Sequence, residues 1–159
     1  MKHITADSPD LGSFPIAIVV SAFNRLITDE LKHGALKELT KRGFEDKDLP
    51  LIEVPGAIEI PLVVKRLAMQ KKVAAIITLG AVIRGETSHY DYVCEQVSTG
   101  CQRVALDYDI PVIFGVLTTE NEAQAWDRLG GKEGHKGAEA ADCAIAMCKI
   151  LEQLDKLDK

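Results

Sequence analysis

The chain has 159 residues, 47% of them hydrophobic and 27% charged, a composition typical of one globular domain (residues 1–159) with a sizeable core. The net charge of −5 argues against binding to nucleic acids or to anionic membranes, because both require a cationic surface. The N-terminus lacks the apolar core of a secretory signal, and no apolar run approaches the roughly 20 residues of a membrane span. We therefore expect a cytoplasmic protein.

Apolar runs alternate with helical patterns along the chain. Strands are predicted at 15–20, 49–54, 73–79 and 110–117. Helices are predicted from Leu26 to Gly43 with Asn24 as a cap, at 58–70, at 88–106, from a Thr119–Glu122 capping box to Arg128, and at 138–154. Continuous apolar strands separated by helices indicate a parallel sheet covered on both faces. We expect an α/β fold, a flavodoxin-like three-layer sandwich with a central four-stranded parallel sheet flanked by helices.

Two features have no obvious place in such a core. The polar segment 1–13 is expected either to be disordered or to pair with a neighbouring subunit. The cysteines Cys94, Cys101, Cys143 and Cys148 form no C-x-x-C pair and lie near no histidine at zinc-ligand spacing. Buried, reduced thiols are favoured for them over a redox or metal role.

The segment from Gly80 to Thr87, G-A-V-I-R-G-E-T, resembles a phosphate-binding P-loop between a strand and a helix. The lysine that reaches the outer phosphates of a nucleoside triphosphate is replaced by Glu86, which would repel them. A single phosphate on a small substrate fits such a loop better, because free N–H groups at a helix N-terminus bind anions. His89 follows in the first turn of the helix, whose dipole favours the neutral imidazole that can accept a proton. Arg84 either adds charge to this site or, as we expect, points to solvent.

Three further segments follow predicted strands, and ligands gather at the carboxyl ends of parallel strands. Phe23 either covers the core or offers a stacking surface to a planar ring. Glu59 either stabilises a helix N-terminus or accepts hydrogen bonds from a polyol or a ring N–H. The basic residues Arg128, Lys132, His135 and Lys136 suggest anion recognition in an acidic chain. Phe114 lies inside a strand and is most simply a core residue.

Together these segments resemble one family. They are S-A-F-N from Ser21, V-P-G-A-I-E-I-P from Val54, G-A-V-I-R-G-E-T-S-H-Y-D-Y from Gly80, I-P-V-I-F-G-V-L-T-T from Ile110 and G-H-K-G-A-E-A-A from Gly134. In this order and spacing, over about residues 15–151, the chain closely resembles the lumazine synthases of riboflavin biosynthesis. The resemblance implies condensation of 5-amino-6-(D-ribitylamino)uracil with 3,4-dihydroxy-2-butanone 4-phosphate, the penultimate step of that pathway, with no cofactor and no metal.

The resemblance also implies a role for each matching residue. His89 is the expected proton-transfer residue. The phosphate is expected to be held by Gly85, Glu86 and Thr87, chiefly through backbone N–H groups, and by Arg128. The pyrimidine and the ribityl chain are expected to contact Phe23, which stacks on the ring, and Ala57, Ile58, Glu59, Ala81, Val82, Ile83, Phe114 and Lys136. Relatives often have an aromatic residue at the position of Ile58 and a small one at that of Glu86.

The family assembles as pentamers, and in many members twelve pentamers form a hollow 60-subunit shell. Phe114, Arg128 and Lys136 are expected to come from the adjacent subunit, so the active site is shared, and riboflavin synthase is a candidate partner. Two other readings stay open on the residues alone. One is an archaeal-type riboflavin synthase, which would need no phosphate site, and the other is a non-enzymatic flavodoxin-like module that binds a flavin or a nucleotide.

Overall fold

The computed structural model describes residues 1–9 and 14–157. Its main sheet has four strands, β1 (Ile16–Ser21), β2 (Leu51–Val54), β3 (Ala75–Ile83) and β4 (Val112–Thr119), in the order β2-β1-β3-β4. Every neighbouring pair in this sheet is parallel. The strands are apolar runs without polar alternation because helices cover both faces of the sheet. The predicted flavodoxin-like α/β fold is confirmed.

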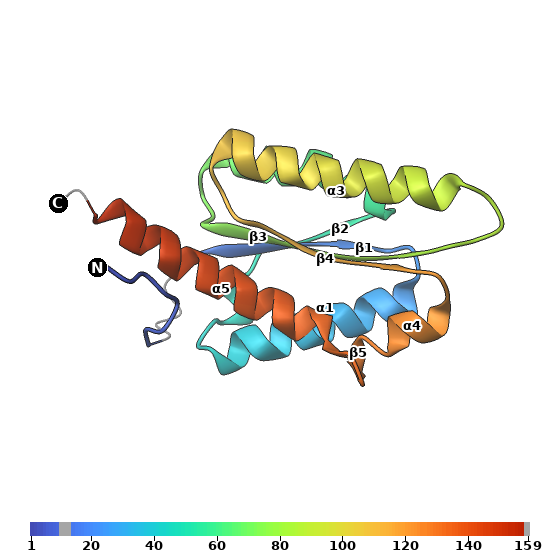
Figure 1. Ribbon diagram of the computed structural model, residues 1–159, viewed down its shortest axis with the longest axis horizontal. Helices are drawn as coiled ribbons and strands as arrows, with labels where there is room; N and C mark the ends of the chain where they lie inside the picture. Colours follow the sequence, from blue (N-terminus) through green and yellow to red (C-terminus); the bar gives the residue numbers. More distant parts are fainter. Residues whose placement is uncertain (10–13, 158–159) are drawn as a thin grey trace.

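Helices form the outer layers of the sandwich (Figure 1). α1 (Arg25–Lys41), α4 (Glu122–Trp126) and α5 (Lys136–Asp155) lie on one face, and α2 (Ile60–Gln70) and α3 (His89–Tyr108) lie on the other. Successive residues of β1 point to opposite faces, so Ile18 joins the core under α1 and α5, whereas Val19 joins the core under α2 and α3. Two 3₁₀ turns, η1 (Asp46–Asp48) and η2 (Ala57–Glu59), precede β2 and α2.

The segment that resembles a P-loop is mostly strand. β3 continues to Ile83 because Gly80–Ile83 pairs with Val116–Thr119 of β4. Gly80 fits here because a Cβ would lie 2.8 Å from the Ser21 Oγ on the neighbouring strand. The connection to α3 is therefore only residues 84–88, and the glycines at 80 and 85 do not belong to one phosphate cradle.

The region after β4 contains the predicted short helix, but the helix ends at Trp126 and its cap differs from the predicted one. α4 is a single short turn, and its N-cap is Asn121, whose Oδ1 accepts a hydrogen bond from the Gln124 N–H at 2.9 Å. The predicted cap Thr119 instead ends β4 and donates its hydroxyl to the Asn121 carbonyl at 2.9 Å. The glycine-rich stretch that follows forms an antiparallel hairpin of β5 (Leu129–Gly131) and β6 (Gly134–His135).

α1 and α5 pack closely where the hairpin enters α5. The His135 Nδ1 accepts hydrogen bonds from the N–H groups of Gly137 and Ala138 and so caps α5. The imidazole lies against Gly34 of α1, where a Cβ would come within 1.9 Å of the His135 Cε1. A Cβ at Gly137 would likewise come within 2.1 Å of the Leu31 carbonyl oxygen. Two glycines thus permit the contact between these helices.

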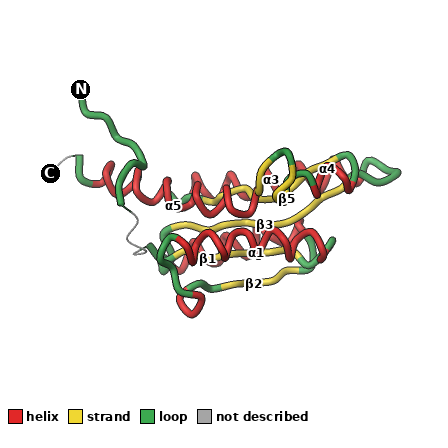
Figure 2. Tube along the Cα trace, turned by 90° about the horizontal axis from the view of Figure 1, so that it is seen from below, coloured by secondary structure: helices red, strands yellow, loops and turns green. Residues whose placement is uncertain are grey.

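The N-terminal segment 1–9 lies beside the C-terminal end of α5, which extends past the sheet (Figures 1 and 2). The carbonyls of Ser8 and Thr5 accept hydrogen bonds from Lys149 and Gln153 of α5. Residues 1–9 therefore contact their own chain, while 10–13 lie outside the described residues. Pairing of this segment with a neighbouring subunit stays a prediction. Among the described residues, no helix is long and apolar enough to cross a membrane.

The cysteines are free thiols in the structure, as predicted, but they are not uniformly buried. Burial raises the pKa of Cys101 to about 12 and that of Cys148 to about 11. Cys94 is half-buried, and Cys143 is exposed on α5. The prediction of buried thiols is therefore confirmed for Cys101 and Cys148 and is wrong for the exposed Cys143.

Candidate active site

A pocket of about 350 Å³ lies at the carboxyl ends of β1 and β3. The chain runs from β1 to β2 on one side and then crosses to β3 on the other, so this is the switch point at which α/β sheets bind ligands. The lining residues come from three connections, the end of β3 and the start of α3: Phe23, Gly56, Ala57, Ile58, Ala81, Val82, Ile83, Gly85, Thr87, His89, Tyr90 and Val93. Most of the predicted pyrimidine-binding residues and His89 therefore share one cavity.

Phe23 is presented to this pocket by its backbone. The N–H groups of Ala22 and Phe23 donate to the carbonyls of Val54 and Pro55, which extends the β1–β2 pairing beyond the strands. Asn24 then adopts a left-handed conformation, φ 61°, which asparagine tolerates better than most residues. Its side chain makes no helix cap and instead donates to the Ala81 carbonyl at 3.0 Å. The Phe23 ring is 71% exposed, so the interpretation as a cover for the core is wrong.

The η2 turn supplies the opposite wall. Ala57 is buried and Ile58 is partly exposed at the pocket. The Glu59 Oε2 accepts a hydrogen bond from the Gly56 N–H at 2.9 Å, which closes the turn. The carboxylate thus has the first of its two predicted roles, stabilising a helical N-terminus. A contact of Glu59 with the ribityl chain stays a prediction, and Glu59 is not among the residues that line the empty pocket.

The connection from β3 to α3 offers backbone donors to a ligand. Within the described part of the chain, no backbone carbonyl accepts a hydrogen bond from the N–H of Gly85, Glu86 or Thr87. The space at Gly85 is open, because a Cβ there would meet no atom within 4 Å. Glu86 is exposed and absent from the pocket lining, whereas Gly85 and Thr87 are part of it. These donors precede the N-terminus of a 20-residue helix, an arrangement that suits a phosphate.

His89 is the first residue of α3, and its imidazole lines the pocket. Its own N–H donates to the Thr87 Oγ1 at 3.3 Å, which ties the helix start to the connection before it. Tyr90 and Val93 also line the pocket, although the sequence analysis did not single them out. Helical periodicity could have found Val93, which follows His89 by one turn. Burial raises the pKa of the Tyr90 hydroxyl, which therefore stays protonated at neutral pH.

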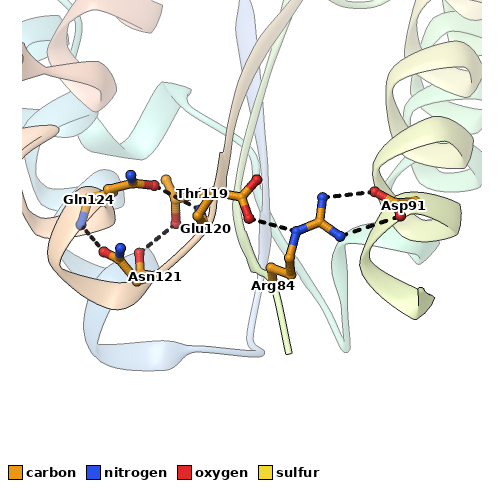
Figure 3. Close-up of polar contacts among 6 residues, drawn as sticks. All are labelled: Arg84, Asp91, Thr119, Glu120, Asn121 and Gln124. Atoms are coloured by element: carbon orange, nitrogen blue, oxygen red, sulfur yellow. Dashed lines mark hydrogen bonds and ion pairs between the residues drawn. The ribbon is translucent and has the colours of Figure 1, made fainter. Parts of the chain in front are cut away.

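Arg84 is not part of the pocket lining, and its side chain is 36% exposed, so the expected exposure to solvent is partly met. It binds Asp91 of α3 and Glu120, which follows β4, and these contacts are drawn in Figure 3. The hydrogen bonds to Asp91 and to Glu120 raise the pKa of the guanidinium. Its charge is thus already matched by two carboxylates.

The other predicted residues lie on a different surface. Phe114, Arg128 and Lys136 line a groove of about 640 Å³ between the edge strand β4 and α5, and this groove shares no lining residue with the first pocket. Phe114 is 42% exposed, so its interpretation as a core residue is wrong. Arg128 donates to the Gln124 carbonyl at 2.8 Å, and Lys136 pairs with Glu139 at 3.1 Å.

The basic residues near Arg128 do not form one anion site. His135 caps α5, as described above, and Lys132 lies 3.9 Å from the Asp127 carboxylate with its side chain 75% exposed. Only Arg128 and Lys136 of this set line the groove. One chain therefore carries an apolar pocket with N–H donors and an imidazole, and a separate groove with an exposed ring and two cations.

Comparisons with known proteins identify the family of this chain. Residues 13–152 match the family model described as 6,7-dimethyl-8-ribityllumazine synthase. Relatives from Coxiella burnetii strains CbuG_Q212 and RSA 493 / Nine Mile phase I, both called 6,7-dimethyl-8-ribityllumazine synthase, are 53% identical over 148 residues. These matches cover 93% of this chain and 98% of each relative.

Among solved structures, the de novo designed Rossmann fold protein ROS2_835 is similar at a TM-score of 0.39 and 16% identity, over 71% of this chain and 93% of that chain. This likeness is too low to bear on function. The family model and the relatives, by contrast, span nearly the whole sequence. The chain belongs to the 6,7-dimethyl-8-ribityllumazine synthase family.

Proposed function

We propose that the pocket at the carboxyl ends of β1 and β3 is where this chain makes 6,7-dimethyl-8-ribityllumazine. The 5-amino group of 5-amino-6-(D-ribitylamino)uracil attacks the ketone of 3,4-dihydroxy-2-butanone 4-phosphate, and loss of water gives an imine. Elimination then releases inorganic phosphate, and the ribityl-bearing nitrogen closes the second ring with loss of another water. The observation that carries the assignment is the convergence of the exposed Phe23 ring, Gly85, Thr87 and His89 in one cavity.

Each part of the pocket suits one part of this reaction. The Phe23 ring and the apolar wall of Ala57, Ile58 and Val82 fit a planar pyrimidine, with stacking on Phe23. The backbone of Ala81–Ile83 borders the same space and is proposed to contact the pyrimidine edge. Glu59 is proposed to turn its second carboxylate oxygen toward the ribityl side of the ligand.

The phosphate is proposed to bind the N–H groups of Gly85, Glu86 and Thr87. Its negative charge is favoured there by the positive end of the α3 dipole. His89 is adjacent and moves protons between the amine, the departing phosphate and the closing ring. Holding the amine and the ketone together supplies much of the rate acceleration by itself. One general acid–base group is therefore sufficient for the remaining catalysis.

We further propose that the site is completed by a second copy of the chain. The groove with Phe114, Arg128 and Lys136 shares no residue with the pocket, so Arg128 reaches the phosphate only from a neighbouring subunit. A pentamer, and a 60-subunit shell of pentamers, follow from the family resemblance.

Other expectations are proposals of the same kind. They are a single domain over residues 1–159, a cytoplasmic location, no required cofactor or metal, and riboflavin synthase as a partner. The two rival functions, archaeal-type riboflavin synthase and a non-enzymatic flavin-binding module, are not favoured by the family to which the chain belongs.

One assay tests the function. The purified protein is mixed with both substrates, and lumazine fluorescence and inorganic phosphate are followed together, with each substrate omitted in turn as a control. We expect both products to appear in equal amounts. A parallel incubation with lumazine alone should give no riboflavin. Protein that yields neither lumazine nor phosphate would contradict the proposal, and riboflavin from lumazine would favour the riboflavin synthase.

A further inference from the structure

Arg84 lies where three elements of the site meet (Figure 3). Its backbone N–H donates to the Thr119 carbonyl at 2.9 Å and so extends the β3–β4 pairing by one residue. Its Nε donates to the Glu120 Oε2 at 2.6 Å. Its two terminal nitrogens donate to the two oxygens of Asp91, at 3.0 and 3.4 Å. One side chain thus joins the end of β3, the connection after β4 and the first turn of α3.

We propose that Arg84 is a positioning residue, which fixes the phosphate-binding connection and His89 without touching substrate; this inference rests on the function proposed above. The connection 84–88 follows the end of β3 at Ile83, so Arg84 is its first residue, and it enters α3 at His89, two residues before Asp91. The bidentate contact between Arg84 and Asp91 therefore closes the connection on itself from both ends. A planar guanidinium with two parallel N–H bonds restricts the angle of its partner as well as the distance.

Arg84 also contacts Tyr90, and this contact connects Arg84 to the pocket. The Arg84 guanidinium lies 4.3 Å from the centroid of the Tyr90 ring, within the range of a cation–π contact. Tyr90 lines the pocket and follows His89 directly, whereas Arg84 is absent from the lining. The guanidinium and the cavity therefore both border Tyr90, and a displacement of Arg84 would reach His89 through Tyr90 and Asp91.

The charges argue for positioning over phosphate binding. Asp91 and Glu120 together carry one more negative charge than Arg84 neutralises, so the guanidinium is not available to an anion. The pairs are exposed, and exposed ion pairs add little to stability unless they are bidentate or form a network. The Arg84–Asp91 contact is bidentate, and with Glu120 it forms a network. We expect this network to act on the orientation of His89 and of the phosphate-binding connection, because catalytic groups must be placed to within a fraction of an ångström.

The first test is the Arg84→Lys variant, which keeps the charge but loses the planar fork. Since small misplacements of reacting groups are costly, kcat should fall about 10-fold or more while the KM for the pyrimidine stays within about twofold. Arg42→Lys is the matched control, because Arg42 also contacts two carboxylates, Glu38 and Asp142, outside the pocket. Its kcat should equal that of the unaltered protein. An unchanged kcat in Arg84→Lys would overturn the proposal.

Asp91→Asn separates positioning from direct phosphate binding. It weakens the hold on Arg84 and leaves the guanidinium more available to an anion. Positioning predicts that Asp91→Asn lowers kcat as Arg84→Lys does. A lower KM for the butanone phosphate in Asp91→Asn, with kcat retained, would instead assign Arg84 to the phosphate and overturn the proposal.

Amide hydrogen exchange gives a readout that does not need activity. Exchange of the His89 and Asp91 N–H groups, which donate to the Thr87 hydroxyl and to the Ser88 carbonyl, should be about 10-fold faster in Arg84→Lys than in the unaltered protein or in Arg42→Lys, because the connection opens more often. Unchanged exchange at these residues would contradict the positioning role of Arg84. The unaltered protein could make no lumazine while exchange is still faster in Arg84→Lys than in the unaltered protein. The proposed function would then fail, and the positioning role of Arg84 would stand.

Discussion

At the scale of single residues, His89 and Arg128 have different roles in the proposed reaction. His89 belongs to the pocket and lies at the start of a long helix, where it can exchange protons with bound substrate. Arg128 belongs to the separate groove and supplies charge. Substitutions at the two positions should therefore affect different kinetic constants.

His89→Ala should lower kcat by about 10²-fold and leave measurable activity, because one general acid–base residue typically contributes about 10²–10⁴-fold and positioning survives the change. The apparent affinities for both substrates should change little. Steady-state kinetics by lumazine fluorescence measure both quantities. A variant that turns over at the rate of the unaltered protein would remove His89 from proton transfer.

Arg128→Ala should raise the KM for the butanone phosphate about 10-fold or more, since a charge-assisted contact to an anion is lost, with a smaller change for the pyrimidine. Lys132→Ala is the matched control: it removes a cation from the same hairpin region, but Lys132 is 75% exposed and does not line the groove. Its kinetics should be unaltered. Equal effects of the two substitutions would point to general electrostatic attraction instead of a specific contact.

At the scale of elements, the close contact of α1 with α5 orients the start of α5. Lys136 is the first residue of α5 and follows the cap His135 directly, so the position of its side chain depends on how the imidazole packs on Gly34. The same packing holds the β5–β6 hairpin beside α1. The groove is thus positioned by a contact on the other side of α5.

Gly34→Ala should destabilise the protein by about 1–3 kcal/mol, the usual cost of overpacking, because its Cβ would overlap the His135 ring. Helix propensity alone predicts the opposite sign, a gain of about 1 kcal/mol. Denaturant unfolding decides between them. In a His135→Ala background, Gly34→Ala should no longer destabilise; if it does, the clash is not with the imidazole.

At the scale of the whole molecule, the separation of the pocket from the groove is the most consequential feature. A site assembled from two copies makes activity depend on assembly, and it allows two defective copies to complement one another. Light scattering on the purified protein should give the mass of a pentamer or of its 60-subunit shell, and a monomer with full activity would contradict sharing.

Co-assembly of His89→Ala and Arg128→Ala subunits tests sharing directly. In a ring of randomly mixed subunits, about a quarter of the interfaces would join an intact His89 to an intact Arg128, so activity at low butanone phosphate should rise well above that of either variant alone. The control is His89→Ala protein that is taken through the same co-assembly procedure alone. If the mixture equals the average of its parts, both residues serve the same chain's site.

Much of this protein is determined by local sequence. The apolar runs predicted four parallel strands, because a strand buried on both faces needs no polar alternation. The motifs that follow the strands placed Phe23, Ala57, Ile58 and His89 at one edge of the sheet, and the pocket contains them all. Such predictions succeed because periodicity and chain direction already fix which residues meet at the carboxyl ends.

The rest was decided by packing between elements that are distant in the sequence. β3 runs on to Ile83 because β4 pairs with it, His135 becomes a cap because Gly34 leaves space for its ring, and Arg84 binds two carboxylates because Asp91 and Glu120 flank it. A hydrophobic pattern carries no information on such partners. The sequence by itself determined the sheet, the family and most of the residues of the pocket. The tertiary structure decided that Tyr90 and Val93 join this pocket and that Arg128 and Lys136 lie in a groove apart from it, because side-chain neighbours across elements are set by packing.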